Sequence, residues 1–388
     1  MKSVLRGVAC WLGWFGCWLM AGADEARSWS RGLPADPGFF PIGVWLQDPR
    51  NAERFKELGV NLYVGLWKGP TTEQLKVLRE AGMPVICSQN ALAREHLDHP
   101  IIVGWMHDDE PDNAQALPGG KGYGPPILPQ VIVDDYRRMR SIDPSRPVLL
   151  NLGQGVAWDD YIGRGVRRRH PEDYREYMRG ADIVSFDIYP VVHEHAAISG
   201  KLEYVASGVE RLMEWKSGNQ RVWNCIECTH ISNPKKKATP GQIRAEVWMA
   251  LIRGSRGLIY FVHQFQPVFR EAALLDDPEN SAAVRSINRE IQELAPVLNS
   301  PSIDGVIKAS AESADHPVAW MLKRAGTATH LFAANLRSAP TKVRFHWQST
   351  DSPPASEVRV VGEPRKLRFE NAGFDDDFQP YAVRHYIW

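Results

Sequence analysis

The sequence contains little cysteine, no excess of either charge, and no long apolar run beyond its first twenty residues. Lys and Arg together number 46 and so do Asp and Glu, so the formal net charge is zero. A chain without a basic excess lacks the electrostatic footprint of proteins that bind nucleic acid or anionic membranes. These classes of partner are therefore not expected.

The N-terminus carries the pattern of a secretory signal. Lys2 and Arg6 precede an apolar run over residues 7–20, and the small residues 21–23 follow it. We predict a signal peptide over residues 1–23, and hence a secreted or periplasmic protein that is free of the membrane after cleavage. A membrane anchor is the alternative, but the run is shorter than the roughly 20 residues that a spanning helix needs. Removal of the signal leaves 44 basic residues against 46 acidic ones, a net charge of −2.

Three cysteines remain after the signal: Cys87, Cys225 and Cys228. An odd number excludes complete pairing within one chain. Cys225 and Cys228 form a CxxC motif, but they lie in a strand-like run whose extended backbone holds them too far apart to bridge. Because no second CxxC completes a zinc site, we predict three buried thiols.

What the sequence does contain is a regular alternation of apolar, β-rich runs and amphipathic helical stretches. The runs lie at residues 41–47, 61–67, 84–89, 102–110, 147–153, 183–190, 221–228 and 257–265. Most are apolar throughout, as expected for strands that are covered on both faces. Several of the helical stretches between them end at Gly, which is a helix stop signal.

Eight β-then-α units predict a (β/α)₈ TIM barrel, which we place at residues 38–300. An open doubly wound sheet is the alternative, but no Gly-rich phosphate loop follows the first strand. From residue 302 to residue 388 the chain shows short alternating runs without a helical pattern, which predicts a C-terminal antiparallel β-sandwich. The Gly/Pro-rich segment 118–129 follows the fourth strand and is expected over the C-terminal face of the barrel.

Polar residues at the carboxyl ends of barrel strands indicate function, because these ends converge on one face. The expected strands end in the following polar or aromatic residues: Gln47, Trp67, Gln89, Asn90, Asp109, Glu110, Asn151, Asp187, Tyr189, Glu227, His230, His263 and Gln264.

Two of these carboxylates differ from the rest. Glu110 ends the stretch GWMHDDE and precedes Pro111, which disfavours helix at Glu110. Glu227 is the only acid in the apolar run VWNCIECTHI, where a buried carboxylate is costly unless it is paired or used. The fourth and seventh strands face each other across a barrel mouth. Two carboxylates about 5–5.5 Å apart there would suit retaining glycoside hydrolysis.

On GWMHDDEPD, FDIYP, WNCIECTH and the run RAEVWMALIRGSRGLIYFVHQF, the chain resembles the large clan of retaining glycoside hydrolases built on (β/α)₈ barrels. The resemblance implies that Glu110 is the acid/base and Glu227 the nucleophile, oriented by a hydrogen bond from Tyr189. It implies cleavage of O-glycosidic bonds in a polysaccharide or oligosaccharide by double displacement, without a cofactor or metal. Contacts to the sugar are expected from Asp109, Tyr189, Trp67, Asn151, Asp187, His230, His263 and Gln264.

Two departures from the clan's pattern stand in the sequence. Asp109 occupies the place where the clan usually has Asn, and the clan's usual arginine near strand two is not visible. A barrel that binds carbohydrate without cleaving it is therefore one alternative. Asp108 and Asp109 could also cap the loop rather than meet a substrate.

A metal-dependent hydrolase or deacetylase is a further alternative. Acidic ligands could come from Asp108, Asp109, Glu110 and Asp112, although the EF-hand spacing and its glycine are missing. His193, Glu194 and His195 could chelate zinc. A histidine site would need at least three side chains to meet from the set His107, His193, His195, His230 and His263. The sequence leaves the sugar, the linkage and the oligomeric state open.

Overall fold

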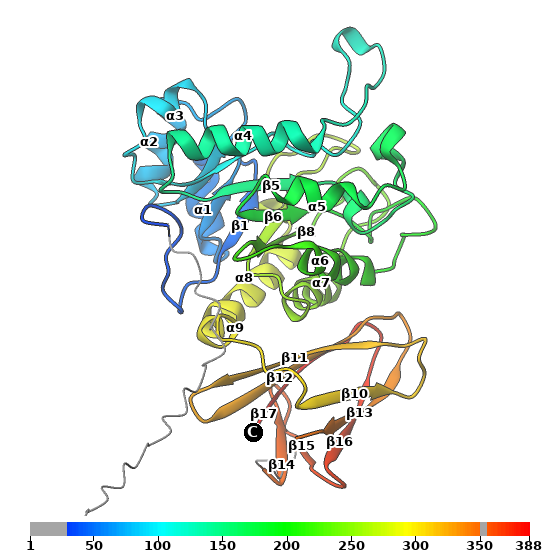
Figure 1. Ribbon diagram of the computed structural model, residues 1–388. Coiled ribbons are helices and arrows are strands. Elements are labelled where there is room, and N and C mark those ends of the chain that lie inside the picture. The colour runs from blue at the N-terminus through cyan, green and yellow to red at the C-terminus, as the bar shows by residue number, and fades with distance from the viewer. Residues whose placement is uncertain (1–28, 350–354) are drawn as a thin grey trace, which may run out of the picture.

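The computed structural model describes residues 29–349 and 355–388, and it contains a barrel followed by a β-sandwich (Figure 1). The predicted signal peptide lies outside the described residues. In the part of the chain that is described, no helix has both the length and the apolar character needed to cross a membrane.

The barrel is a sheet of nine parallel strands in the order β7-β6-β5-β4-β3-β2-β1-β9-β8. Two of the nine, β7 and β8, are halves of one barrel strand interrupted at Trp223, whose N–H donates to the Val184 carbonyl at 2.9 Å. The strands are β1 (Ile42–Trp45), β2 (Leu62–Val64), β3 (Val85–Ser88), β4 (Ile102–Met106), β5 (Val148–Leu152), β6 (Ile183–Phe186), β7 (Arg221–Val222), β8 (Asn224–Glu227) and β9 (Leu258–Phe261). The eight predicted strand positions are confirmed, each with shorter bounds.

Helices follow the barrel strands and cover the outside of the sheet. They are α1 (Ala52–Glu57), α2 (Thr72–Glu80), α3 (Ala91–Glu95), α4 (Pro129–Ile142), α5 (Asp173–Met178), α6 (Glu203–Trp215), α7 (Pro240–Ile252), α8 (Pro278–Glu293) and α9 (Ala295–Leu298). Local chemistry sets several starts. Thr239 and Gln242 form a capping box at α7, and Asp277 caps α8 by accepting from the Asn280 N–H at 3.1 Å.

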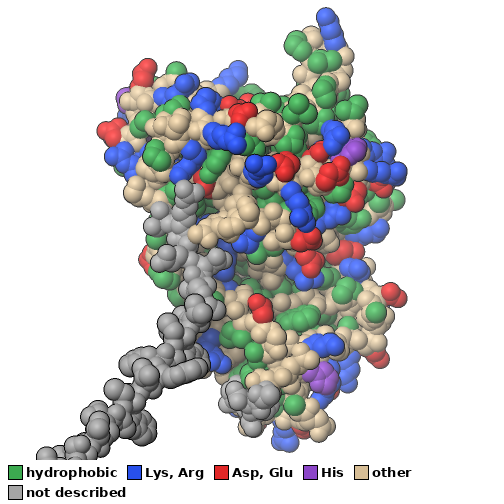
Figure 2. Space-filling view, in the orientation of Figure 1, with side chains coloured by type: hydrophobic (Ala, Val, Ile, Leu, Met, Phe, Trp, Pro, Cys, Tyr) green, Lys and Arg blue, Asp and Glu red, His purple; other side chains and the backbone are tan. Residues whose placement is uncertain are grey.

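Two antiparallel sheets form the C-terminal part, with strand orders β10-β13-β16 and β11-β12-β17-β14-β15. Their strands are β10 (Ile307–Ala311), β11 (Val318–Ala325), β12 (Ala328–Asn335), β13 (Thr341–Trp347), β14 (Glu357–Val360), β15 (Lys366–Arg368), β16 (Gly373–Phe378) and β17 (Val383–Ile387). The predicted fold class, a TIM barrel with a C-terminal β-sandwich, is confirmed. Acidic and basic side chains are interspersed over the face shown in Figure 2.

Helix α7 joins the two parts, because it is buried on all sides from Ala245 to Ile252. Its inner face packs on the barrel, and Trp248 stacks on Phe332 of β12 with the ring centroids 5.0 Å apart. The three described cysteines are free and buried, as predicted.

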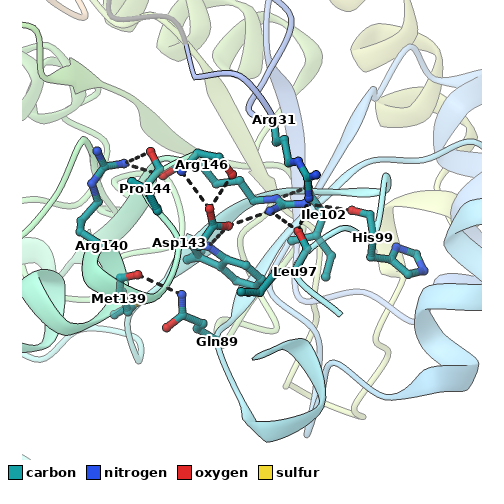
Figure 3. Close-up of polar contacts among 12 residues, drawn as sticks. Arg31, Gln89, Leu97, His99, Ile102, Met139, Arg140, Asp143, Pro144 and Arg146 are labelled. Carbon is teal, nitrogen blue, oxygen red and sulfur yellow. Dashed lines mark hydrogen bonds and ion pairs between the residues drawn. The ribbon is translucent and has the colours of Figure 1, made fainter. Parts of the chain in front are cut away.

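The amino end of the barrel is fastened by a buried ion pair. Arg146 and Asp143 lie 2.7 Å apart, and their side chains are 1% and 5% exposed. The Arg146 guanidinium also donates to the carbonyls of Leu97, His99 and Ile102 (Figure 3). This network ties the start of β4 to the residues that precede β5, at the end of the barrel opposite the mouth.

Replacing Arg146 with Met should lower the free energy of unfolding by about 3–5 kcal/mol, because Asp143 would remain buried without its cation. Urea titration would measure the loss. The matched control is Arg137→Met on the exposed face of α4, where the ion pair with Asp134 is solvated and should contribute less than about 1 kcal/mol. Equal losses in the two variants would contradict this account.

Candidate active site

Three carboxyl groups meet in the mouth of the barrel. Asp109 and Glu110 follow β4, and Asp187 follows β6, two places along the sheet. Asp109 is exposed and Glu110 and Asp187 are half-buried, although the Oδ1 atom of Asp187 is itself buried. Glu110 hydrogen-bonds Asp187, and Tyr189 also hydrogen-bonds Asp187.

Glu110 has a strained backbone conformation. Its φ is +45°, a left-handed value that costs a non-glycine residue of order 1–3 kcal/mol. The Glu110 N–H donates to the Asn151 carbonyl at 3.2 Å, and Asn113 Nδ2 donates to Glu110 Oε2 at 2.8 Å. Three other non-glycine residues with positive φ lie at the exits of β1, β2 and β8: Leu46, Lys68 and Ile231.

Gly153 at the exit of β5 is required by close approach. A Cβ at this position would lie 2.9 Å from Glu110 Oε1 and 2.7 Å from the Asn113 side chain. A side chain at position 153 would displace the Glu110 carboxyl or the Asn113 amide that holds it, so this position needs glycine.

Asp112 is a buried carboxyl next to the site that joins two strand exits. It is fully buried, and it accepts hydrogen bonds from the Gly153 N–H at 2.9 Å and from the Tyr174 hydroxyl at 2.8 Å. Burial raises the pKa of Asp112, although these donors and Arg164 oppose the shift. Asp112 was expected only as a conceivable metal ligand, and in the structure it instead fixes the β4 and β5 exits.

Asn151 links Asp109 to Ser185 by hydrogen bonds across the mouth of the barrel. Its Nδ2 donates to Asp109 Oδ1 at 2.9 Å, and its Oδ1 accepts from Ser185 Oγ at 2.7 Å. The Cys225 thiol lies 3.7 Å from the same oxygen. Asp109 is thereby oriented by an amide on the next strand.

The pKa of each of the three mouth carboxyls is raised. Loss of hydration is the largest cause in every case, and mutual repulsion follows for Asp109 and Glu110. The hydrogen bond with Asp187 raises the pKa of Glu110 further, whereas hydrogen bonds from Glu110 and Tyr189 oppose the rise of the Asp187 pKa. Glu110 therefore holds the proton that the two groups share, and Asp187 is the ionised partner.

Glu227, which the resemblance implies as the nucleophile, is enclosed by protein. Its side chain is fully buried, its two carboxylate oxygens accept from the N–H groups of Val191 and Val192, and its remaining partner is Glu246 of α7. The hydrogen bond that Tyr189 was expected to give Glu227 goes to Asp187. A carboxylate that is enclosed by protein and held by two amides presents no surface to a substrate in this structure.

The other predicted contacts divide into two groups. Trp67 lies 65% exposed just after β2, and Tyr189 packs on Phe261 with ring centroids 5.1 Å apart. Further from the carboxyls, His230 hydrogen-bonds the carbonyls of Asn233 and Lys236, His263 hydrogen-bonds Gln47, and Gln264 pairs with Arg270. These three residues organise loops at the β8 and β9 exits.

The histidines proposed as a metal centre do not gather. His107 hydrogen-bonds the Gly180 carbonyl, His193 hydrogen-bonds Gln154, and His195 packs on Trp158 with centroids 4.7 Å apart. Across residues 29–349 and 355–388, no three His, Cys, Asp or Glu side chains are arranged to hold a metal ion.

Sequence reasoning missed Tyr161 and Glu246. Tyr161 lies near the carboxyls: burial raises the pKa of its hydroxyl, and the charges of Glu110 and Asp187 add to the shift. No sequence signal distinguishes it. Glu246 did carry a signal, because it is the only acid in the apolar stretch AEVWMALI, the same pattern that directed attention to Glu227.

No protein family model matches the chain, and no curated protein matches it. Among solved structures, the α-amylase from Geobacillus thermoleovorans complexed with acarbose has 13% identity and a TM-score of 0.55, covering 93% of this chain and 99% of that one. An Anoxybacillus α-amylase has 11% identity, coverages of 91% and 98%, and a TM-score of 0.52. A putative α-galactosidase from Bacteroides fragilis has 10% identity, coverages of 90% and 79%, and a TM-score of 0.52. These likenesses establish the shared architecture of barrel and C-terminal β domain.

Removing the charge of Asp187 should lower the pKa of Glu110, because Asp187 is the strongest charged neighbour that raises it. The measurement is the ¹³C NMR titration of the Glu110 carboxyl in Asp187→Asn. Asp108→Asn, which alters an exposed carboxyl two residues from Glu110, should leave that midpoint in place. An unchanged midpoint in Asp187→Asn would show that the two carboxyls are not coupled.

Proposed function

We propose that this protein is a glycoside hydrolase that cleaves O-glycosidic bonds of a polysaccharide or oligosaccharide. The observation that carries the proposal is the group of Asp109, Glu110 and Asp187, reachable from solvent in the barrel mouth, with environments that separate a protonated Glu110 from an ionised Asp187. Two carboxyl groups in opposite protonation states are what acid-assisted glycoside cleavage needs.

In the proposed double displacement, the Glu110 carboxyl protonates the glycosidic oxygen as the bond to the anomeric carbon breaks. The Asp187 carboxylate attacks that carbon and forms a glycosyl ester. Glu110, now ionised, takes a proton from water, whose oxygen displaces Asp187 and restores both groups. The Glu110–Asp187 hydrogen bond must open to admit the sugar, because a retaining pair works at about 5–5.5 Å. Asp109, oriented by Asn151, would contact a sugar hydroxyl.

Exposed aromatic side chains at the mouth favour a sugar chain as substrate. Trp67 follows β2, and Phe265 and Phe269 follow β9, with exposures of 65%, 45% and 59%. Flat apolar rings such as these can stack on the apolar faces of sugars. The predicted signal sequence supports action outside the cytoplasm. The related proposal, a barrel that binds carbohydrate without cleaving it, shares this surface and differs only in the chemistry of the carboxyls.

The test begins with hydrolysis of a panel of polysaccharides and chromogenic glycosides. Glu110→Gln should lower kcat/KM by about 10²–10⁴-fold on unactivated substrates, because the proton donor is removed. Asp187→Gly should lose activity and regain it on an activated glycoside with added azide, giving a glycosyl azide. Glu227→Gly should show no such rescue.

The outcomes separate the assignments. Azide rescue of Glu227→Gly but not of Asp187→Gly would assign the nucleophile to Glu227 and overturn the role proposed for Asp187. Binding of oligosaccharides without hydrolysis across the whole panel would establish the binding protein instead of the enzyme.

Replacing Trp67 with Ala should raise KM for a polysaccharide by roughly fivefold, since a ring contact of about 1 kcal/mol is lost. The KM for a small chromogenic glycoside should change less, because such a substrate does not extend to the exit of β2. Trp320→Ala, which removes a partly exposed tryptophan from the sandwich, serves as the control. Parallel changes with both substrates would contradict a chain-binding role.

A further inference from the structure

Two glutamates outside the proposed chemistry touch inside the protein. Glu227 ends β8, Glu246 lies in α7, and each side chain is 0% exposed. A hydrogen bond joins their carboxyl groups. Both oxygens of Glu246 are buried. Among the described residues, the groups that interact with them are the carboxyl group and the backbone N–H of Glu227.

Two carboxyl groups in contact cannot both be ionised without a cation to offset the repulsion. The groups that act on Glu227 are Glu246 and the N–H groups of Val191 and Val192, none of which is a cation. Burial raises the pKa of both glutamates, and the charge of Glu227 raises that of Glu246 further. Glu246 therefore holds the proton and donates it to Glu227, which accepts the two amides.

The amides that Glu227 accepts belong to the segment after β6. The Val191 N–H lies 2.6 Å from Glu227 Oε1, and the Val192 N–H lies 3.0 Å from Oε2. Asn233 Nδ2 holds the same segment by donating to the Val192 carbonyl at 2.9 Å. Asp187 and Tyr189 precede this anchor by only a few residues, so the anchor limits where they can lie.

We propose that Glu227 and Glu246 share one proton and act as a positioning pair, which pins residues 190–192 and thereby holds Asp187 and Tyr189 in the barrel mouth. The shared proton is independent of the proposed function. Its effect on catalysis rests on that function.

The first test is the pH dependence of unfolding in the wild type and in Glu246→Gln. The native wild type keeps a proton that the unfolded chain releases above the ordinary glutamate pKa. Its folding equilibrium constant should therefore fall, relative to Glu246→Gln, by about tenfold per pH unit from about pH 5 until the pair ionises. Glu246→Gln keeps the hydrogen bond to Glu227 through its amide but has no proton to lose.

Other titrating groups do not mimic this difference. The charges of Glu227 and Glu246 act on Cys228, and so does the charge of Asp277. The raised pKa of Cys228 keeps the thiol neutral, and the lowered pKa of Asp277 keeps that carboxyl ionised in this range. The raised pKa values of Asp109, Glu110 and Asp187 contribute equally to the pH dependence of both proteins, so these contributions cancel in the comparison. Glu214→Gln on the exposed face of α6 should follow the wild type. Identical slopes in the wild type and Glu246→Gln would overturn the shared proton.

The second test measures positioning through amide hydrogen exchange and kinetics. In Glu246→Leu the donor to Glu227 is lost, so the Val191 and Val192 amides should exchange at least tenfold faster. With a hydrolysable substrate, kcat should fall at least tenfold while KM changes little, and Glu246→Gln should retain most of kcat. Unchanged exchange and kcat in a folded Glu246→Leu would overturn the positioning role. If the wild type hydrolyses nothing, the proposed function fails, yet the exchange and stability measurements still decide this inference.

Discussion

Loss of hydration at closely spaced carboxyl groups is the constraint on which the centre of this structure depends. Two groups of acids lie at the exits of the barrel strands, one in the mouth and one between β8 and α7. Within residues 29–349 and 355–388, no cation is in direct contact with either group. Each must therefore keep protons at a pH where isolated carboxyls release them. The barrel supplies the fixed distances that make this coupling strong.

The two groups differ in their exposure to solvent, and this difference separates a group that can meet a substrate from one that can only stabilise the fold. The mouth group is reachable from solvent, and its members come from strand exits with strained or closely packed backbone at Glu110 and Gly153. The inner pair is enclosed by protein, and its member Glu227 accepts hydrogen bonds from two backbone amides. Similar carboxyls with similarly raised pKa values can thus serve different purposes, which their surroundings decide.

The barrel could be predicted because strands covered on both faces must be apolar throughout, and eight such runs stand in the sequence. In the sandwich, the sequence shows alternating runs at residues 318–326, 329–337, 342–348, 357–362 and 381–388, and β10, β15 and β16 lie outside them. Strand β16 reads GFDDDF, and its acids oppose residues of β13 in a pairing that only the folded chain reveals. Glu110 and Asp187 could be recognised as polar residues at strand exits. Glu246 carried a signal as the only acid in an apolar stretch, but its pairing with Glu227 could not be predicted, because a contact between β8 and α7 depends on side-chain directions that no spacing encodes.

Helix α7 lies between the barrel and the sandwich, and it carries Glu246 toward one and Trp248 toward the other. Its outer face is as apolar as its inner face. An ordinary barrel helix turns a polar outer face to water, whereas the outer face of α7 is buried against the sandwich. The sandwich is accordingly not an accessory that could be lost without cost. Glu246 and Trp248 lie in the same turn of α7, so the packing of the sandwich on this helix is linked to the position of the carboxyl pair. Through Glu227 and the amides of residues 191 and 192, that link extends to the exit of β6.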